Sequence, residues 1–356
     1  MRVLLIEPYF GGSHRVWAEG YAAASGHEVT IVSHAARGWT WRMRGAAVTL
    51  ARQVAELAST GYRPDVVLVS SMVDVAALRT FLHPSIGRPP LAVYFHENQL
   101  TYPIGPRQKP DASFALLNWT SALSADRVYF NSGYHHDVFF AEIRRLLESF
   151  PDHTHAGFVG EVEERSAVLP VGVDLHWASA QPSRSGTPLV LWNHRWEHDK
   201  DPESFADGIR AVAETHRFRL ALAGERFGTV PGVLDEVASE MADRIEVNDH
   251  LDVDGYRALL LRSDIVVSTA LQEFFGISVV EAIAAGARPV LPRRLSYPWL
   301  IPESHHESVL YEPGAFASAL RIALDYPYAP DGLRSSMSTF DWSVIAPRYD
   351  AALEVL

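Results

Sequence analysis

The sequence predicts two doubly wound α/β domains in tandem. Short apolar segments rich in β-branched residues alternate with helical patterns along most of the 356 residues, which indicates parallel sheets covered by helices on both faces. A segment rich in Ser, Pro and Gly and without periodicity, residues 178–188, separates two such series. Neither series contains a sequence repeat or a low-complexity tract.

Each series contains five expected strands. In the first domain, residues 1–177, they are residues 2–7, 27–33, 65–70, 91–97 and 127–132. In the second domain, residues 188–335, they are residues 189–194, 219–225, 244–249, 264–270 and 288–292, with helices near 203–215, 252–261 and 278–285. The last segment, residues 336–356, has helix-forming residues on either side of Pro347, and we expect it to pack back on the first domain.

Composition and charge narrow the classes of protein. Cysteine is absent, so a disulfide framework and thiolate metal sites are excluded, and nothing favours an oxidising compartment. The first apolar run stops at Glu7 and Pro8, too soon for a signal peptide, and no apolar stretch approaches membrane-spanning length. We therefore expect a cytoplasmic protein. The net charge of -12 repels polyanions at long range, so a nucleic acid would need a local basic surface.

One stretch has the composition of such a surface, residues 37–45, which read RGWTWRMRG. No acidic residue occurs between Ala35 and Val54, whereas four arginines and two tryptophans do: Arg37, Arg42, Arg44, Arg52, Trp39 and Trp41. Guanidinium groups bind phosphate and aromatic planes stack on unpaired bases. The alternative is that both tryptophans are core residues of a helix whose exposed face carries the arginines.

The chemistry is expected where strands end. Ligands of open α/β sheets bind beyond the carboxyl ends of the strands, so two facing domains would form a cleft lined by strand-end loops. One loop holds Glu273 and Gly276 and enters a helix near Ser278, where unpaired backbone amides suit an anion. Ser278 and Glu281 also have the spacing of a capping box, which would explain Glu281 without a ligand.

A second loop of the same domain, LWNHRWEHDKDP, presents Arg195 and Lys200. Two cations beside a helix start suit a diphosphate, although they would also neutralise neighbouring acidic residues, namely Glu197, Asp199 and Asp201. His194 and His198 have zinc-ligand spacing, but they lie in a loop and no third ligand follows. We therefore expect no metal there.

Two loops of the first domain are candidates for the opposite wall of the cleft. Gly11 and Gly12 follow the first strand, where a missing Cβ permits either a tight turn or close approach of a ligand. The dinucleotide fingerprint G-x-G-x-x-G is absent. The fourth strand ends in four polar residues, HENQ, beginning with His96 and including Asn98, and such side chains are costly to bury unless bonded.

Taken together, Arg195–x4–Lys200 and Glu273–x7–Glu281 around Phe275, Gly276 and Ile277 resemble the retaining glycosyltransferases of family 4. That resemblance implies the GT-B fold, two doubly wound Rossmann-like domains facing across a cleft. It implies that Arg195 and Lys200 bind the diphosphate of a nucleotide sugar and that Glu281 binds the ribose. Donor contacts with the sugar and phosphates would come from the residues Gly11, Gly12, His96, Glu273, Phe275, Gly276, Ile277 and Ser278.

Four stretches resemble a narrower family, the tRNA-queuosine α-mannosyltransferases: EPYFGGSH, WTWRMR, YFHENQLTYP and HRWEHDKDP. These enzymes transfer mannose from GDP-mannose to queuosine in a tRNA anticodon. The resemblance implies a nucleotide sugar and a queuosine tRNA as partners, with no membrane, obligate protein partner or metal cofactor. It implies the catalytic residues His96, Arg195, Lys200 and Glu273, and acceptor contacts from His14, Trp41, Arg42, Arg44 and Asn98.

Two other functions remain open from the residues. A family 4 enzyme acting on a lipid or small-metabolite acceptor would need a membrane-facing basic helix in the lipid case, and only the Trp/Arg stretch has that composition. A non-catalytic tRNA or nucleotide-sugar binding protein is the third reading, and the intact Arg195, Lys200, Glu273 and Glu281 argue against it. Residues 140–170 and those beyond 290 carry no recognised resemblance.

Overall fold

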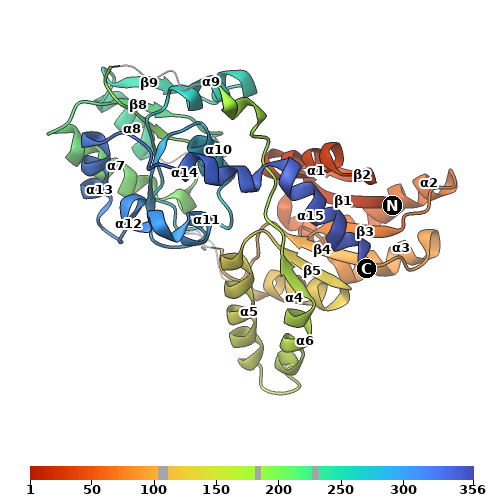
Figure 1. The fold of residues 1–356 in the computed structure, drawn as a ribbon. Coiled ribbons are helices and arrows are strands. Elements are labelled where there is room, and N and C mark those ends of the chain that lie inside the picture. Colours follow the sequence, from red (N-terminus) through yellow and green to blue (C-terminus); the bar gives the residue numbers. More distant parts are fainter. Residues whose placement is uncertain (103–110, 181–185, 227–231) are drawn as a thin grey trace. The chain divides into compact units, whose positions relative to one another are not determined.

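The computed structural model describes residues 1–102, 111–180, 186–226 and 232–356. The chain forms two compact units, each with its own sheet (Figure 1). Unit 1 comprises Met1–Gly172 and Trp342–Leu356, and unit 2 comprises Val173–Asp341. Of the linker expected at residues 178–188, residues 181–185 lie outside the described residues.

Each unit is built on a six-stranded sheet in which all strand pairs are parallel. In unit 1 the order is β2-β1-β3-β4-β5-β6, formed by β1 (Arg2–Phe10), β2 (Glu28–Ala35), β3 (Val66–Ser70), β4 (Leu91–Phe95), β5 (Arg127–Phe130) and β6 (Ser166–Val168). In unit 2 the order is β12-β11-β10-β7-β8-β9, formed by β7 (Leu189–Trp192), β8 (Arg219–Leu222), β9 (Ile245–Asn248), β10 (Ile265–Val267), β11 (Arg288–Pro292) and β12 (Leu310–Tyr311). The prediction of two doubly wound α/β domains is confirmed.

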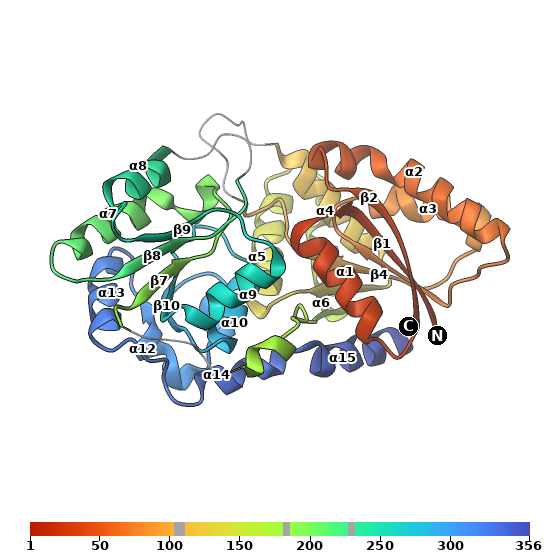
Figure 2. The same cartoon turned by 90° about the horizontal axis from the view of Figure 1, so that it is seen from above.

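Helices connect the strands on both faces of each sheet (Figures 1 and 2). Those of unit 1 are α1 (Gly12–Ala24), α2 (Trp39–Ser59), α3 (Val75–Ile86), α4 (Ala112–Ser124), α5 (Gly133–Glu148), η1 (His155–Phe158), α6 (Val159–Glu164) and α15 (Trp342–Glu354). Those of unit 2 are η2 (His176–Ser179), η3 (His198–Lys200), α7 (Pro202–Ala213), α8 (Gly232–Glu240), α9 (Val253–Arg262), α10 (Ile277–Ala284), α11 (Tyr297–Leu300), η4 (Glu303–His305), α12 (His306–Val309), α13 (Phe316–Asp325), α14 (Leu333–Ser336) and η5 (Met337–Phe340). None of the helices in the described residues is long and apolar enough to cross a membrane.

The strand orders place one switch point in each sheet. In unit 1 the direction of winding changes between β1 and β3, and in unit 2 it changes between β7 and β10. Loops diverge at such points and leave a crevice at the carboxyl edge of the sheet, where ligands of doubly wound folds bind. The loops that follow β1, β7 and β10 are therefore the ones to examine for a site.

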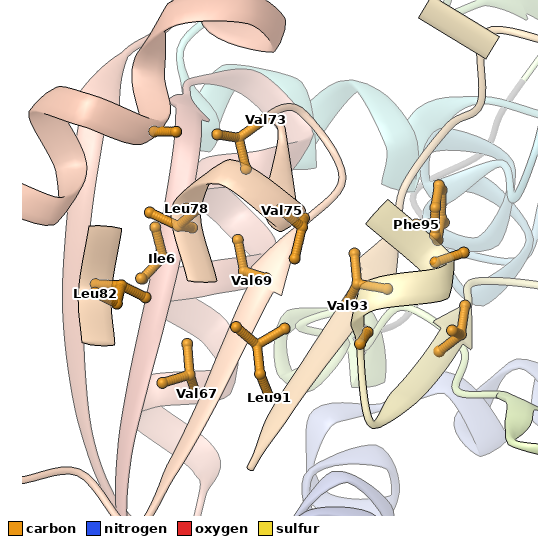
Figure 3. Close-up of a cluster of buried hydrophobic side chains, with 14 of the residues drawn as sticks. Ile6, Val67, Val69, Val73, Val75, Leu78, Leu82, Leu91, Val93 and Phe95 are labelled. Carbon is orange, nitrogen blue, oxygen red and sulfur yellow. The ribbon is translucent and has the colours of Figure 1, made fainter. Parts of the chain in front are cut away.

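The larger core cluster of unit 1 lies on one face of its sheet. Alternate strand residues such as Ile6, Val69 and Val93 point to this face and pack against apolar residues of α3, including Leu78 and Leu82 (Figure 3). These side chains are at most 3% exposed, and burial of each stabilises the fold by about 1.5–3 kcal/mol. The same cluster takes in α2, α4, α5 and α6, so five of the described helices contribute to it.

The opposite face of the unit 1 sheet is covered by α1 and the C-terminal helix α15. Trp17 stacks on Tyr94 with ring centroids 4.8 Å apart, and its indole N–H donates to the hydroxyl of Tyr349 at 3.1 Å. Asp350 accepts hydrogen bonds from the hydroxyls of Tyr21 and Ser25 at 2.9 and 2.6 Å. The last helix of the chain is thus an integral layer of the first unit.

Two short strands were not expected from the sequence. The strand β6 has three residues and β12 has two, and each lies at an edge of its sheet. A segment of two or three residues is too short to show either an apolar run or an alternation. The ten expected strands all appear, so the sheets differ from the prediction only at these edges.

The packing of α15 on α1 generates a stability prediction. Gly20 lies in α1, and a Cβ at this position would overlap the indole of Trp342 in α15. We expect Gly20→Ala to lower the free energy of unfolding by about 1–3 kcal/mol through overpacking, measured by urea unfolding. Gly160→Ala is the matched control, because a Cβ there meets nothing within 4 Å. Equal stability of the two variants would contradict this packing.

Candidate active site

In unit 2 the loops after β7 and β10 are joined by hydrogen bonds at the switch point. The backbone N–H groups of Leu271 and Gln272 donate to the carbonyl of Asp199 at 2.8 and 3.2 Å. The hydroxyl of Thr269 donates to the carbonyls of Lys200 and Asp201 at 2.8 and 2.9 Å. The two loops that carry the predicted diphosphate residues therefore form one body.

The side chain of Lys200 lies between these loops and is only 8% exposed. Its ammonium donates to the carbonyl of Gln272 at 2.7 Å and lies 3.2 Å from Asp199 Oδ2 and 3.4 Å from Glu273 Oε2. Burial opposes the charge, yet Glu273 and Asp199 raise the pKa of Lys200 above its usual value, so the ammonium stays protonated. Lys200 is thus a fixed positive charge beside Glu273.

Arg195 lies in the same loop but in a different environment. Its side chain is 49% exposed and its Nη2 lies 3.2 Å from Glu197 Oε2. The alternative reading of the two cations, neutralisation of neighbouring acids, thus describes part of both environments: Arg195 with Glu197 and Lys200 with Asp199. An exposed ion pair contributes little to stability, about 0–1 kcal/mol, so Arg195 can exchange its partner for an anion at small cost.

The helix that follows the Glu273 loop starts differently from the sequence expectation. Its N-cap is Gly276, with φ 103°, and no side chain caps it, so the capping-box reading of Ser278 and Glu281 is wrong. The left-handed backbone at Gly276 favours glycine and begins α10 at Ile277, one residue before the predicted start. Val279 and Val280 donate to the carbonyl of Gly276, and the amides of Ile277 and Ser278 precede these bonds at the positive end of the helix.

Glu281 is the fifth residue of α10 and faces a polar pair rather than the helix start. The hydroxyl of Tyr256 donates to Glu281 Oε2 at 3.4 Å, and Asn193 donates to that hydroxyl at 3.0 Å and to the carbonyl of Ser278 at 2.9 Å. Burial raises the pKa of Glu281 to about 7. This carboxyl group is therefore close to its midpoint of titration at neutral pH.

In unit 1 the corresponding edge is formed by the end of β1 and the start of α1. The pairing of β1 with β2 shifts register between Glu7 and Phe10, and bulges of this kind re-aim side chains near sites. Glu7 is fully buried. Its Oε1 accepts a hydrogen bond from the backbone of Tyr9 at 2.8 Å and lies 3.2 Å from His14 Nδ1.

His96, at the end of β4, reaches the same place from another strand. Its Nε2 lies 3.9 Å from Glu7 Oε2, and its ring centroid lies 4.2 Å from that of His14. Burial, together with His14 and His135, lowers the pKa of His96 well below its usual value. Among the described residues, the ligand atoms of Glu7, His14 and His96 lie within 4.8 Å of one another, close enough to hold a metal ion.

The other predicted residues of unit 1 flank this cluster. Asn98 is fully buried, and its side-chain oxygen accepts from the amides of Leu100 and Thr101 at 2.9 and 3.1 Å, so it shapes the turn. Gly11 packs so tightly that a Cβ would overlap Ala36, whereas Gly12 has φ 50° and faces open space. Packing therefore explains Gly11, and the geometry leaves Gly12 accessible to a ligand.

The Trp/Arg stretch forms the first turns of α2, next to the loop after β2. Trp39 is 36% exposed and Trp41 66%, so the reading that both are core residues is wrong. The indole of Trp41 lies against the helix at Gly45, where a Cβ would be only 2.6 Å from its ring. Trp39 packs on Phe114 with centroids 5.1 Å apart. The indole of Trp41 is thus exposed to solvent while it packs against α2.

The arginines of this stretch have different partners. Arg42 donates to the carbonyl of Ala35 at 3.1 and 3.3 Å. Arg44 pairs with Asp111 at 2.9 Å and lies over the ring of Phe114, 4.3 Å from its centroid. The stretch has no acidic neighbour in the sequence, but in the fold Asp111, the N-cap residue of α4, lies beside Arg44. Arg37 and Arg52 are exposed.

The structure adds residues that sequence reasoning missed. Glu7 is the one acidic residue of β1 and follows a buried apolar run, a signal that indicates a functional carboxylate. Asp199 and the brace formed by Arg294 and Ser296 carried no such signal. Arg294 donates to the carbonyl of Thr269 at 2.8 Å and Ser296 to that of Phe275 at 3.0 Å, which holds the loop after β10 in place.

Comparison with protein families covers both units. Residues 2–173 match the model of the N-terminal region of tRNA-queuosine alpha-mannosyltransferase, and residues 187–325 match that of group 1 glycosyl transferases. A tRNA-queuosine alpha-mannosyltransferase of Drosophila melanogaster is 30% identical over 315 residues, covering 85% of this chain and 82% of the relative. A GDP-mannose:cellobiosyl-diphosphopolyprenol alpha-mannosyltransferase of Xanthomonas oryzae pv. oryzae is 24% identical and covers 52% of this chain and 51% of its own.

Solved structures share the fold at low identity. Sucrose-phosphate synthase of Thermosynechococcus elongatus matches with a TM-score of 0.70 and 16% identity, covering all of this chain and 98% of that one. Anabaena HepE in complex with UDP and glucose matches with a TM-score of 0.68 and 15% identity, covering both chains fully. At these identities the likeness supports the fold alone, which is the two-domain GT-B architecture.

The environment of Glu281 generates a prediction on pH dependence. Because the pKa of this carboxyl is raised in the folded chain, its contribution to stability is present below its unfolded pKa and is lost as pH rises through about 7. We expect Glu281→Gln to stabilise the protein relative to wild type by about 2 kcal/mol more at pH 8 than at pH 5, measured by urea unfolding. The exposed Glu214 gives the control Glu214→Gln. A difference that is constant across pH would contradict a buried, titrating Glu281.

Proposed function

The chain belongs to the tRNA-queuosine alpha-mannosyltransferase family, and we propose that it transfers mannose from GDP-mannose to queuosine in the anticodon loop of a tRNA, with retention at the anomeric carbon. The observation that carries this proposal is the buried Lys200 beside Glu273 at the start of α10, in a chain 30% identical to such an enzyme over most of its length. We propose that it does so in the cytoplasm.

We propose that unit 2 holds the donor. Lys200 and Arg195 would bind the diphosphate, together with the amides of Ile277 and Ser278 at the positive end of α10. Glu273, with Phe275 and Gly276, would bind the sugar hydroxyls. Lys200 carries its charge before the donor arrives, because Asp199 and Glu273 keep it protonated. Such preorganised charge stabilises a leaving anion with little reorganisation.

Glu281 would bind the ribose of the donor. Its carboxyl already accepts a hydrogen bond from Tyr256, and a ribose hydroxyl donates in the same way. Since its pKa lies at about 7, the group is partly protonated at neutral pH. A ribose hydroxyl that donates to the ionised carboxylate would favour the charged form, so donor binding would lower this pKa.

The proposed transfer step balances without a protein nucleophile. The bond between the anomeric carbon and the diphosphate breaks while a bond to the acceptor oxygen forms on the same face of the sugar. The proton of the acceptor hydroxyl passes to the departing phosphate oxygen, and GDP is released. Side-chain cations and helix amides neutralise the leaving group, so we propose that the step needs no divalent metal.

We propose that unit 1 holds the acceptor. His96 would orient the donor sugar from this side, with Gly11 and Gly12 near the donor, while His14 and Asn98 contact the nucleoside. The exposed indole of Trp41 provides a plane for an unpaired base. Arg42 and Arg44 would contact phosphate, and Arg44 would then leave Asp111, its partner in an exposed and therefore weak ion pair. This local surface offsets the net charge of -12.

The direct test incubates the protein with radiolabelled GDP-mannose and bulk tRNA from cells with or without queuosine. We expect label in tRNA only when queuosine is present. Arg195→Ala should lower kcat/KM at least about tenfold, because an interaction with the diphosphate is lost, and should leave thermal unfolding unchanged since the side chain is exposed. Label in a lipid extract or small metabolite would identify the alternative acceptors, and hydrolysis and transfer absent for every donor would indicate a binding protein.

The acceptor surface can be tested by binding alone. Trp41→Ala should weaken binding of a fluorescent anticodon stem-loop by about tenfold, since stacking on one base is worth about 1–3 kcal/mol. Anisotropy titrations measure this effect. Val48→Ala serves as the control, because Val48 is also exposed on α2. If the two variants bind equally tightly, the indole does not contact the RNA.

A further inference from the structure

A carboxylate and two imidazoles of unit 1 are buried together where β1 ends. Glu7 is fully buried, and the side chains of His14 and His96 are only 9% and 8% exposed. They arrive from three different elements: β1, the first turn of α1 and the end of β4. Burying a carboxylate costs several kcal/mol unless charged or hydrogen-bonding groups surround it. The arrangement therefore needs a reason beyond packing.

Glu7 uses a separate oxygen for each imidazole. His14 Nδ1 lies 3.2 Å from Oε1, and His96 Nε2 lies 3.9 Å from Oε2. Oε1 is also fixed by the backbone N–H of Tyr9 at 2.8 Å. Trp17 meets the ring of His96 edge-on at 4.5 Å and Tyr94 does so at 4.7 Å. The ring of His96 is thus held by aromatic packing, and Oε1 of Glu7 by a backbone hydrogen bond.

The nearness of the carboxylate influences electrostatically which ring nitrogens carry protons. A carboxylate attracts a proton to the nitrogen that faces it, which favours Nδ1–H in His14 and Nε2–H in His96. The lone pair of each neutral ring then lies on the other nitrogen. His96 is held neutral by its burial and by His14 and His135, so its tautomer determines whether it accepts or donates a hydrogen bond toward a substrate hydroxyl.

We propose that Glu7 is a positioning residue, whose buried carboxylate sets the orientation and the tautomer of both His14 and His96. The inference rests on the proposed function, in which His96 orients the donor sugar and His14 contacts the acceptor. Glu7 itself is too deeply buried to touch either substrate. It acts through the two rings, so that each presents a hydrogen-bond acceptor of fixed direction to the reacting groups.

The same three residues would also fit a metal ion by distance. Ligands of one ion direct their lone pairs at a common centre. Here His14 Nδ1 lies beside Oε1 and His96 Nε2 lies beside Oε2, so the two nitrogens approach different oxygens of the carboxylate, and neither contact has hydrogen-bond geometry. Metal analysis of the purified protein distinguishes a metal site from the positioning role, because a stoichiometric ion bound at this cluster would overturn the proposal.

The tautomers can be read without any assay of activity. Two-bond proton–nitrogen correlation spectra of the ¹⁵N-histidine-labelled protein report which ring nitrogen is protonated, and loss of signals in His14→Gln and His96→Gln assigns the two rings. We expect Nδ1–H for His14 and Nε2–H for His96 in wild type. In Glu7→Gln, whose amide has the same shape and no charge, at least one ring should change tautomer. Opposite tautomers in wild type, or identical spectra in Glu7→Gln, would overturn the proposal.

Enzyme activity provides a second test of the role of Glu7. If wild type transfers mannose to queuosine tRNA, Glu7→Gln should lower kcat by about 10- to 100-fold while KM for both substrates stays within about threefold of wild type. Glu7→Asp, which keeps the charge on a shorter side chain, should recover part of this loss. Glu148→Gln, exposed at the end of α5, should match wild type.

The outcomes separate this inference from the proposed function. An inactive wild type with the expected tautomers would contradict the proposed function and leave the positioning role supported by the spectra. An active wild type with unchanged kcat in Glu7→Gln would contradict the positioning role alone. Circular dichroism of each variant verifies folding, and should Glu7→Gln not fold, the wild-type spectrum and Glu7→Asp decide.

Discussion

The site of unit 2 depends on one buried ammonium group. Lys200 joins the loop after β7 to the loop after β10 through the carbonyl of Gln272 and the carboxylates of Asp199 and Glu273. Removing one member of a buried charge cluster leaves the others uncompensated, at a cost of about 3–5 kcal/mol. The contacts of Lys200 that join the two loops therefore also fix a positive charge in the site before a ligand binds. A substitution of Lys200 would therefore change both the packing of the loops and the charge of the site.

Unit 1 has a buried carboxylate in the comparable position. Glu7 lies in the second half of β1 and the Lys200 loop follows β7, and both strands adjoin the switch point of their sheet. The sign of the buried charge differs between the two units, and so do its partners. Glu7 lies beside two imidazoles, whereas Lys200 lies beside two carboxylates. A parallel sheet brings strand ends together at one edge, and each unit uses that edge for one fixed charge.

Much of the fold could be predicted because buried parallel strands are continuous apolar runs, such as VVLVS at residues 66–70. The strands β6 and β12 could not be predicted, because segments of three and two residues show no pattern. Motif spacing indicated Lys200 and Glu273, but the pairing of Glu7 with His14 and His96 joins positions up to 89 apart, and local patterns carry no record of such contacts. Trp39 and Trp41 were ambiguous because the buried stripe of α2 begins only at Met43. The reading of Ser278 as a cap failed because the left-handed Gly276 had already started the helix.

The layered contact of α1 with α15 has a consequence for biosynthesis. Trp17 and Tyr21 emerge from the ribosome early, while Tyr349 and Asp350, which cover them, are translated only after the whole of unit 2. Until then α1 covers that face of the first sheet without α15, and the aromatic side chains that α15 buries remain available to chaperones. Unit 1 can therefore complete its folding only after α15 has been synthesised.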